Sequence, residues 1–426
     1  MSKFITDDHS DDGVDRRGFL KCMAWAGTGM LWAIKGGIPT STALGRGLDV
    51  GSEVAKGDLF FVQISDSHIG FNKAANQDVS ATLRESIDRI NALPQRPAFL
   101  LHTGDITQLS APTEFDTAQQ LIGSARTTSG KTFFVPGEHD VIGDNGASYL
   151  RHYGKGTKGG GWYSFDHSGV HFIGLVNVLD LKPGGLGNLG GEQLEWLERD
   201  VRHLSSSTPI VVFAHVPLWT VYPQWGWGTD DGARALTYLK RFGSVTVLNG
   251  HIHQVVQKIE GNVRFHTAMS TAFPQPAPGS APSPGPLTVP AEQLRNFLGL
   301  TSVTIVPKQH SLALVDATLS GVAGVQAAHV MNGDANRHAA APLAPGEVAI
   351  DNFSFTPREV TIAAGTKVTW LNHDDVPHQI VSSDKRFAPS SVLDTGQRYE
   401  RAFEQPGRYA YFCALHPTMT GTVMVR

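Results

Sequence analysis

Five short segments of the sequence contain aspartate, glutamate and histidine, the side chains that bind transition metals. In chain order they are "ISDSHIG", "HTGDI", "PGEHD", "FAHVP" and "NGHIH". Their candidate ligands are Asp66, His68, Asp105, Glu138, His139, Asp140, His215, His251 and His253. A lone histidine is more often structural than a ligand, but five such segments in a fixed order are a strong signal. Mixed oxygen and imidazole donors suit Fe, Mn or Zn and do not single out one of them.

A second set of candidate ligands lies in "YAYFCALHPTM", residues 409–419. Cys413, His416 and Met419 follow one another at intervals of three, and His378 lies upstream in "VPHQI". Two imidazoles, one thiolate and a weak thioether are the ligand set of a blue-copper electron-transfer site. The alternative is a buried, inert cysteine in a plain β-sandwich.

The first set must be positioned by alternating strands and helices. From Leu59 to about Leu319, short apolar runs alternate with amphipathic helical patterns. Buried strands between such helices predict a layered α/β domain, which we place at residues 57–318. Because each ligand segment directly follows an apolar run, the ligands should meet where the strands end.

The second set must be positioned by strands alone. From Glu347 onward, alternating strand patterns are separated by turn signals, which predicts a small all-β domain at residues 347–426. On the strand that ends in "FC", side chains alternate between two faces, so Cys413 should end the strand. Residues 319–346 are rich in small side chains without a sustained period, and we interpret them as a linker.

Length and composition limit the remaining possibilities. A chain of 426 residues is too long for one ordinary core. Its 41% hydrophobic and 17% charged residues are typical of a soluble globular protein. A formal net charge of −4 provides no basic patch, so no nucleic-acid binding is expected.

The N-terminal segment resembles a bacterial twin-arginine export signal. "DRRGFLK" contains Arg16 and Arg17, an apolar run spans residues 23–34, and "PTSTALG" supplies small residues for cleavage. The alternatives are an amphipathic helix or a membrane anchor, but a bilayer needs roughly 20 apolar residues. We therefore expect a signal peptide at residues 1–43, a periplasmic protein and no stable membrane anchor after cleavage.

The order D-x-H, G-D, G-x-H-[DE], H, G-H-x-H resembles the calcineurin-like metallophosphoesterases, and most closely the branch with cyclic-nucleotide and glycerophosphodiester phosphodiesterases. The resemblance implies a β-sandwich flanked by helices and two metal ions bridged by Asp105. It assigns Asp66, His68 and His253 to the first metal, Glu138, His215 and His251 to the second, and His139 to the acid near the leaving group. The implied reaction is attack by a metal-bridging hydroxide on a phosphoester.

Two positions depart from patterns of this family. Glu138 stands where the family usually has asparagine, so a charged oxygen donor replaces a neutral one. We expect Glu138 to bind metal, the alternative being that it swings away and only one ion binds well. Gln108 stands where the purple-acid branch needs tyrosine, so a tyrosinate–iron site is not expected.

Residues 347–426 resemble the cupredoxins, and most closely the amicyanin and plastocyanin group. The resemblance implies one copper ion held by His378, Cys413, His416 and Met419, with Asn372 bracing the cysteine loop. Ala414 stands where the group often has Ser or Thr, so we expect a somewhat different copper potential.

Two further patterns are weaker evidence for a binding site. "GLGNLG" at residues 185–190 matches a dinucleotide-binding motif, but its setting predicts only a flexible loop. Trp219, Trp225 and Trp227 could line a substrate pocket or pack within a long loop.

The sequence thus predicts an exported metal-dependent phosphoric ester hydrolase, with a phosphodiester as the favoured substrate, that carries a copper electron-transfer domain. The alternative is a copper redox protein whose phosphoesterase domain is weak or inactive. The redox partner would be another periplasmic protein or the dinuclear site itself.

Overall fold

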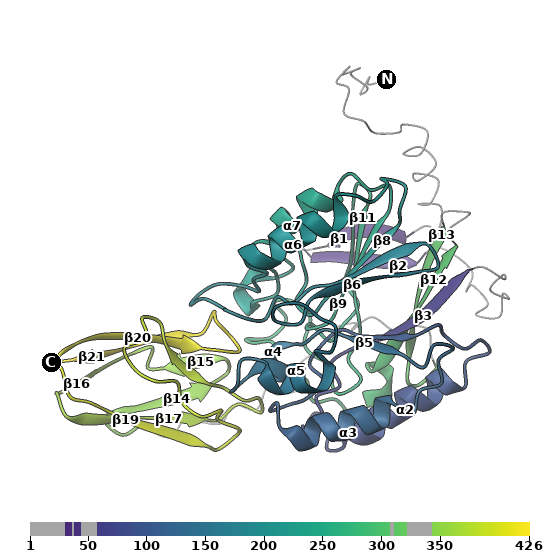
Figure 1. Ribbon diagram of the computed structural model, residues 1–426. Coiled ribbons are helices and arrows are strands. Elements are labelled where there is room, and N and C mark those ends of the chain that lie inside the picture. Colours follow the sequence, from purple (N-terminus) through teal and green to yellow (C-terminus); the bar gives the residue numbers. More distant parts are fainter. Residues whose placement is uncertain (1–29, 36–37, 44–57, 307–310, 322–342) are drawn as a thin grey trace.

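The computed structural model describes residues 30–35, 38–43, 58–306, 311–321 and 343–426. Figure 1 shows a large part with helices on its outside and a smaller all-β part beside α4 and α5. Arg16 and Arg17 of the expected export signal, and residues 322–342 of the expected linker, lie outside the described residues.

Strands and helices both occur up to Thr318, whereas the described residues after it, 319–321 and 343–426, contain strands and no helix. The helices are α2 (Val79–Asn91), α3 (Pro112–Ile122), α4 (Glu138–Val141), α5 (Ala147–Tyr153), α6 (Gly191–Val201) and α7 (Gly232–Leu239), with short 3-10 turns η2 (Pro223–Trp225) and η3 (Leu294–Asn296). The strands before Thr318 are β1 (Met30–Lys35), β2 (Ile38–Ala43), β3 (Leu59–Ile64), β4 (Leu100–His102), β5 (Thr132–Phe134), β6 (Tyr163–His167), β7 (Val170–Gly174), β8 (Ile210–Ala214), β9 (Val245–Asn249), β10 (Gln257–Glu260), β11 (Val263–Thr267), β12 (Gly299–Val306) and β13 (Ser311–Thr318). The later strands are β14 (Glu347–Asp351), β15 (Ser354–Thr356), β16 (Glu359–Ile362), β17 (Thr366–Asn372), β18 (Ile380–Ser382), β19 (Arg398–Phe403), β20 (Gly407–Cys413) and β21 (Thr420–Val425).

The large part contains two sheets packed face to face. One has six strands in the order β10-β11-β9-β8-β7-β6, and the other has five in the order β13-β12-β3-β4-β5. Side chains of both sheets meet in one core, where Phe61 of β3 packs edge-on against Phe172 of β7. Successive side chains of a strand point to opposite faces, so Val62 and Ile64 pack in a different core, which they share with α2 and α3.

Helices cover the outer faces of both sheets. Leu83 and Ile87 of α2 are buried against the five-stranded sheet, as the helical periodicity predicted. Leu194 and Leu197 of α6 are buried with α7 against the six-stranded sheet. This layering confirms the predicted β-sandwich flanked by helices.

The smaller part is a sandwich of two four-stranded sheets. Their orders are β15-β14-β17-β19 and β16-β21-β20-β18, and fully buried Trp370 and Tyr411 meet edge-on in the core between them. Cys413 is the last residue of β20, as predicted. Within the described ranges, the search for a helix long and apolar enough to cross a membrane returned none.

Candidate metal centres

The candidate ligands of the large part follow strand ends of both sheets. Asp66 and His68 follow β3, Asp105 follows β4, Glu138 begins α4 after β5, His215 follows β8, and His251 and His253 follow β9. These strands include the parallel pairs β3–β4 and β8–β9, so their carboxyl ends lie at one edge. The structure therefore brings the predicted residues together as strand order required.

Most of these residues adopt a left-handed backbone conformation that residues other than glycine rarely adopt. The φ angles are 53° at Asp66, 41° at His68, 52° at Asp105, 72° at His251 and 53° at His253. Such conformations persist only where surrounding contacts enforce them, and they gather at functional sites. All five side chains contribute donor atoms to the groups of candidate ligands.

Asp140 and Gly137 hold these turns in place. The Asp140 carboxylate accepts hydrogen bonds from the backbone N–H groups of Ile106, Thr107 and Gly137 at 2.9–3.1 Å. A Cβ atom on Gly137 would lie 2.0 Å from the Asp105 carboxylate, so no larger residue fits there. Asp140 therefore positions the Asp105 and Glu138 segments and belongs to neither ligand group.

The ligand atoms form two groups that share one carboxylate. In the first group, the His253 Nε2 lies 3.3 Å from Asp66 and 3.2 Å from the His68 Nε2. In the second group, the Glu138 carboxylate lies 3.0 Å from the His215 Nε2 and 2.8 Å from the His251 Nδ1. Asp105 Oδ2 lies 3.5 Å from the His68 Nε2 and 3.3 Å from the His215 Nε2, between the two groups.

The hydrogen bonds of the imidazoles fit metal ions at both groups. His215 Nδ1 donates to the Thr103 carbonyl at 2.7 Å and His253 Nδ1 donates to the Phe273 carbonyl at 2.6 Å. In a neutral ring this leaves Nε2 as a bare lone pair facing the cluster. Buried Glu138 Oε2, His215 Nε2 and His251 Nδ1 make no hydrogen bond within the described part of the chain. Facing lone pairs of this kind need a cation between them.

Charge states of the cluster suit cations as well. Burial lowers the pKa of His68 to about 3, so its ring is neutral. Burial alone would raise the pKa of Glu138, but the imidazoles of His251 and His215 hold it well below its usual value. Burial alone would lower the pKa of His215, but the carboxylates of Asp105 and Glu138 raise it well above its usual value, so a metal ion entering the second group would displace a proton from this ring.

Glu138 faces the second group and does not swing away from it. Its two oxygens separately approach His215 and His251, and its side chain is only 7% exposed. Both oxygens of Glu138 therefore face the second group of candidate ligands.

His139 lies beside the cluster in a different setting. Its Nδ1 is 2.8 Å from the Gln108 carbonyl, and its backbone N–H donates to Asp105 at 3.0 Å. Its ring packs edge-on against His68, with 4.7 Å between centroids. The side-chain oxygen of Gln108 also lies 2.9 Å from the Nδ1 of His68. The sequence had indicated only that Gln108 replaces a tyrosine, and did not predict this contact.

The second set of candidate ligands converges at one end of the smaller sandwich. Cys413 Sγ lies 3.5 Å from the His378 Nδ1 and 3.6 Å from the His416 Nδ1, and the two nitrogens are 3.3 Å apart. A point equidistant from the three atoms lies about 2 Å from each, which is the length of a metal–imidazole bond. Met419 is buried in the same core and closes the loop by backbone hydrogen bonds to Cys413 and His416.

The charge state of Cys413 also fits copper. Burial alone would raise its pKa, but His378 and His416 hold it well below its usual value, which favours the thiolate. Asp374 Oδ2 accepts a hydrogen bond from the His378 Nε2 at 2.9 Å and so fixes which nitrogen faces Cys413. The sequence analysis missed Asp374, although it lies four residues before the ligand.

Asn372 differs from its expected role. Its side chain donates to the carbonyls of Val376 and Leu393 at 2.8 and 2.9 Å and accepts from the Asp374 N–H. These bonds brace the segment that carries His378, and not the cysteine loop. The reason is that the amide lies at the end of β17, directly before that segment.

The three tryptophans divide between the two expected roles. Trp225 lines a pocket with Glu138 and His251, whereas Trp227 is only 1% exposed and Trp219 packs against Phe265. Packing therefore accounts for two of the three.

Known proteins match the two parts of the chain separately. Residues 61–255 match the family of calcineurin-like phosphoesterases, and residues 346–426 match copper binding proteins of the plastocyanin/azurin family. Amicyanin-alpha of Methylorubrum extorquens is 36% identical over 89 residues, which are 20% of this chain and 75% of that protein. A 3',5'-cyclic-nucleotide phosphodiesterase of Nostoc sp. is 25% identical over 221 residues, 50% of this chain and 79% of that protein. A glycerophosphodiester phosphodiesterase of Enterobacter lignolyticus is 25% identical over 209 residues, 46% of this chain and 72% of that protein.

These matches agree with the donor sets found at the two centres. The chain belongs to the plastocyanin/azurin family of copper-binding proteins through residues 346–426, and its residues 61–255 match the calcineurin-like phosphoesterases.

Proposed function

We propose that this protein hydrolyses a phosphodiester at the Asp105 cluster and carries a one-electron copper centre at Cys413. Family membership implies a metal-dependent phosphoesterase with divalent ions and a copper domain. The observation that carries the proposal is the carboxylate of Asp105, which lies between two groups of ligands. Two relatives named as phosphodiesterases support a diester as the substrate.

The residues of the cluster divide between two ions of Fe, Mn or Zn. Asp105 would bind both; the first ion would add Asp66, His68 and His253, and the second would add Glu138, His215 and His251. When bound, such a pair neutralises phosphoryl oxygens and lowers the pKa of water held between the ions. The carbonyls of Thr103 and Phe273 fix the ring orientations, so the ligands need little rearrangement when metal enters.

His139 is the proposed general acid. Because the Gln108 carbonyl holds Nδ1, the other nitrogen of the ring is left to give a proton to the leaving oxygen. The ring lies against His68 and its backbone is anchored to Asp105, which keeps it beside the cluster.

Copper would be held by His378, Cys413 and His416, with Met419 as a weak fourth ligand. The separations of 3.3–3.6 Å among the three strong donors support this set. Copper in such a site exchanges one electron with a partner.

Export and domain organisation complete the proposal. A signal peptide at residues 1–43 with Arg16 and Arg17 would direct the protein to the periplasm. The proposed domains are residues 57–318 and 347–426, joined by a linker at 319–346. They are supported by the end of β13 at Thr318 and the start of β14 at Glu347.

The test is hydrolysis of a chromogenic phosphodiester by the metal-stripped protein, with and without added Mn, Zn or Fe. We expect turnover only with added metal. His139→Gln should keep both ions but lose roughly 10²–10⁴-fold in rate, as expected for a general acid. Zero rate with every metal, together with intact copper binding, would instead favour the alternative of a copper redox protein with an inactive phosphoesterase part.

A further inference from the structure

The copper ligands differ in how far they reach the surface of the smaller sandwich. His378 and Cys413 are fully buried and Met419 is 4% exposed, whereas His416 is partly exposed. The rate of electron transfer falls steeply with distance, so an electron enters or leaves such a site through the ligand nearest to its partner. In this protein that ligand is His416.

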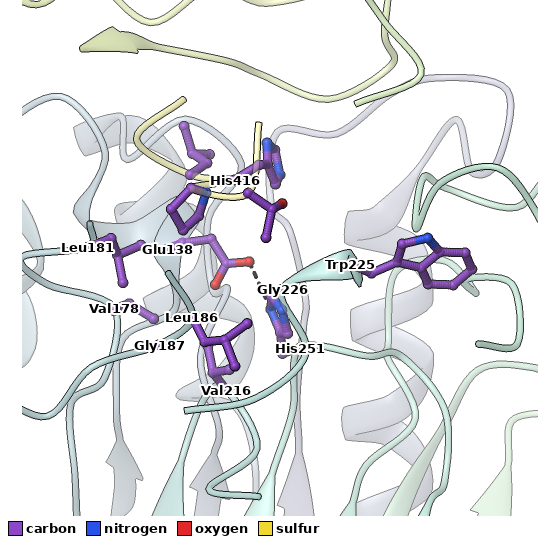
Figure 2. Close-up of a pocket in the computed structure, with 13 residues that line it drawn as sticks. Glu138, Val178, Leu181, Leu186, Gly187, Val216, Trp225, Gly226, His251 and His416 are labelled. Atoms are coloured by element: carbon purple, nitrogen blue, oxygen red, sulfur yellow. Dashed lines mark ion pairs between the residues drawn. The ribbon is translucent and has the colours of Figure 1, made fainter. Parts of the chain in front are cut away.

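The open side of His416 faces the cluster of Asp105. His416 and Pro417 line one pocket together with Glu138 and His251 of the phosphoesterase part. Figure 2 shows His416 on the copper loop at one side of this pocket and the Glu138–His251 pair at the other. The pocket measures about 30 Å³, which is room for a couple of water molecules.

Direct contacts hold the two parts in this arrangement. The Gly184 N–H donates to the carbonyl of Pro417 at 2.6 Å, directly after the copper ligand. Ile142, four residues after Glu138, is buried in the core cluster of the smaller sandwich. Lys73 lies 3.5 Å from Asp394 across the same boundary. Three separate segments of the phosphoesterase part thus contact the copper part.

A further contact involves the copper ligand itself. Phe353 packs edge-on against the His416 ring, with 4.6 Å between centroids, and also lies next to Gly285 of the phosphoesterase part. Phe353 and the pocket residues of the phosphoesterase part therefore surround much of the His416 ring.

We propose that the dinuclear cluster of the same chain is the electron partner of the copper centre, with His416 as the residue that links them. The inference rests on the metal assignments of the proposed function. With iron held by Glu138, His215 and His251 and copper held at Cys413, one electron would pass from ferrous iron to cupric copper, giving ferric and cuprous ions with no bond or proton changed. The Glu138 carboxylate, which lies 3.0 Å from His215 and 2.8 Å from His251, would favour the ferric product, because it supplies a harder oxygen donor than the neutral amide expected from the family resemblance.

The test follows copper in the full-length protein without oxygen. Ferrous iron is loaded at the cluster, free metal is removed, and loss of the cupric absorption and EPR signal is recorded. We expect a first-order loss whose rate constant does not change with protein concentration. The zinc-loaded protein is the control and should keep its cupric signal. No loss in the iron form, or a rate proportional to protein concentration, would overturn the proposal, the latter in favour of an external partner.

Docking variants provide an independent measurement. Lys73→Glu places like charges opposite each other and should slow the first-order loss roughly threefold. The exchange Lys73→Glu with Asp394→Lys restores opposite charges and should restore the rate. An unchanged rate in Lys73→Glu, with docking loosened as judged by cross-linking, would contradict the assigned path. Phosphodiester hydrolysis by the zinc form of the same preparations shows separately whether the proposed function holds.

Discussion

At the scale of single residues, Glu138 is the point where this cluster departs from its family. Its carboxylate meets both imidazoles of the second group, so its removal should weaken that group alone. We expect Glu138→Ala to bind the second ion at least about 100-fold less tightly, and Glu138→Gln, which keeps an oxygen donor, to lose less. Metal analysis after equilibrium dialysis measures this directly. Two tightly held ions in Glu138→Ala would show that Glu138 is no ligand.

Asp374 offers a second test at this scale. Burial alone would raise its pKa, but His378 lowers it, so an ionised carboxylate receives the Nε2–H of a copper ligand. This makes the imidazole a stronger donor and stabilises the cupric state. Asp374→Asn should therefore raise the copper potential by roughly 50 mV, the equivalent of about 1 kcal/mol for one electron.

A redox titration followed by visible absorption measures the shift. Asp384→Asn is the matched control, because this exposed aspartate of the same part bonds only to neighbours in its own turn. A lower or unchanged potential in Asp374→Asn would refute the assigned effect.

At the scale of elements, His171 ties β7 to β6 and α6. Its two nitrogens lie 2.8 Å from Asp166 and 2.9 Å from Asp200. Burial alone would lower the pKa of His171, but the hydrogen bonds to these two carboxylates raise it above its usual value. The protonated ring therefore stabilises the fold fully below about pH 6.5, and this contribution disappears as pH rises through the folded-state pKa.

His171→Gln makes this dependence measurable. The variant should reduce the free energy of unfolding by about 1–2 kcal/mol near pH 6, and by less near pH 9, because the wild-type protein has lost its charged pair there. Denaturant unfolding at both pH values provides the comparison. A difference that grows with pH would contradict the sign of the argument.

The strands and helices of this structure were more predictable from the sequence than the contacts between their side chains. Continuous apolar runs predicted β3 and β8, because buried parallel strands are apolar on both faces. Ligands directly after such runs had to meet, since strand ends share an edge. The partners of the ligands, such as Asp140 and Asp374, were not predictable because turns fix them through hydrogen bonds between distant segments.

At the scale of the whole molecule, the docked position of the copper part also controls access to the cluster. Six of the seven predicted ligands of the dinuclear cluster have side chains that are at most 7% exposed, and the side chain of His251, at 13%, opens to the pocket that the copper loop lines. Nothing in the sequence indicated this, because the contacts at Gly184 and Pro417 are backbone groups. The loop at 185–190, predicted to be only flexible, contributes Leu186 and Gly187 to that pocket.

Hydrolysis and electron transfer should therefore respond to docking in opposite directions. His416 and Pro417 of the copper loop line the pocket at Glu138 and His251, so we expect a bulky diester to reach these ligands only when the loop moves away. The apparent kcat/KM is then the value of the open form multiplied by the fraction of molecules that are open.

Lys73→Glu should raise kcat/KM for a bulky phosphodiester about two- to fivefold, because it removes a stabilising ion pair from the closed form. The charge-exchanged double variant should return it to the wild-type value. Steady-state kinetics at low salt measures this effect, which should fade as salt screens the pair. A fall in kcat/KM would show that the copper loop helps to bind the substrate and does not cover the site.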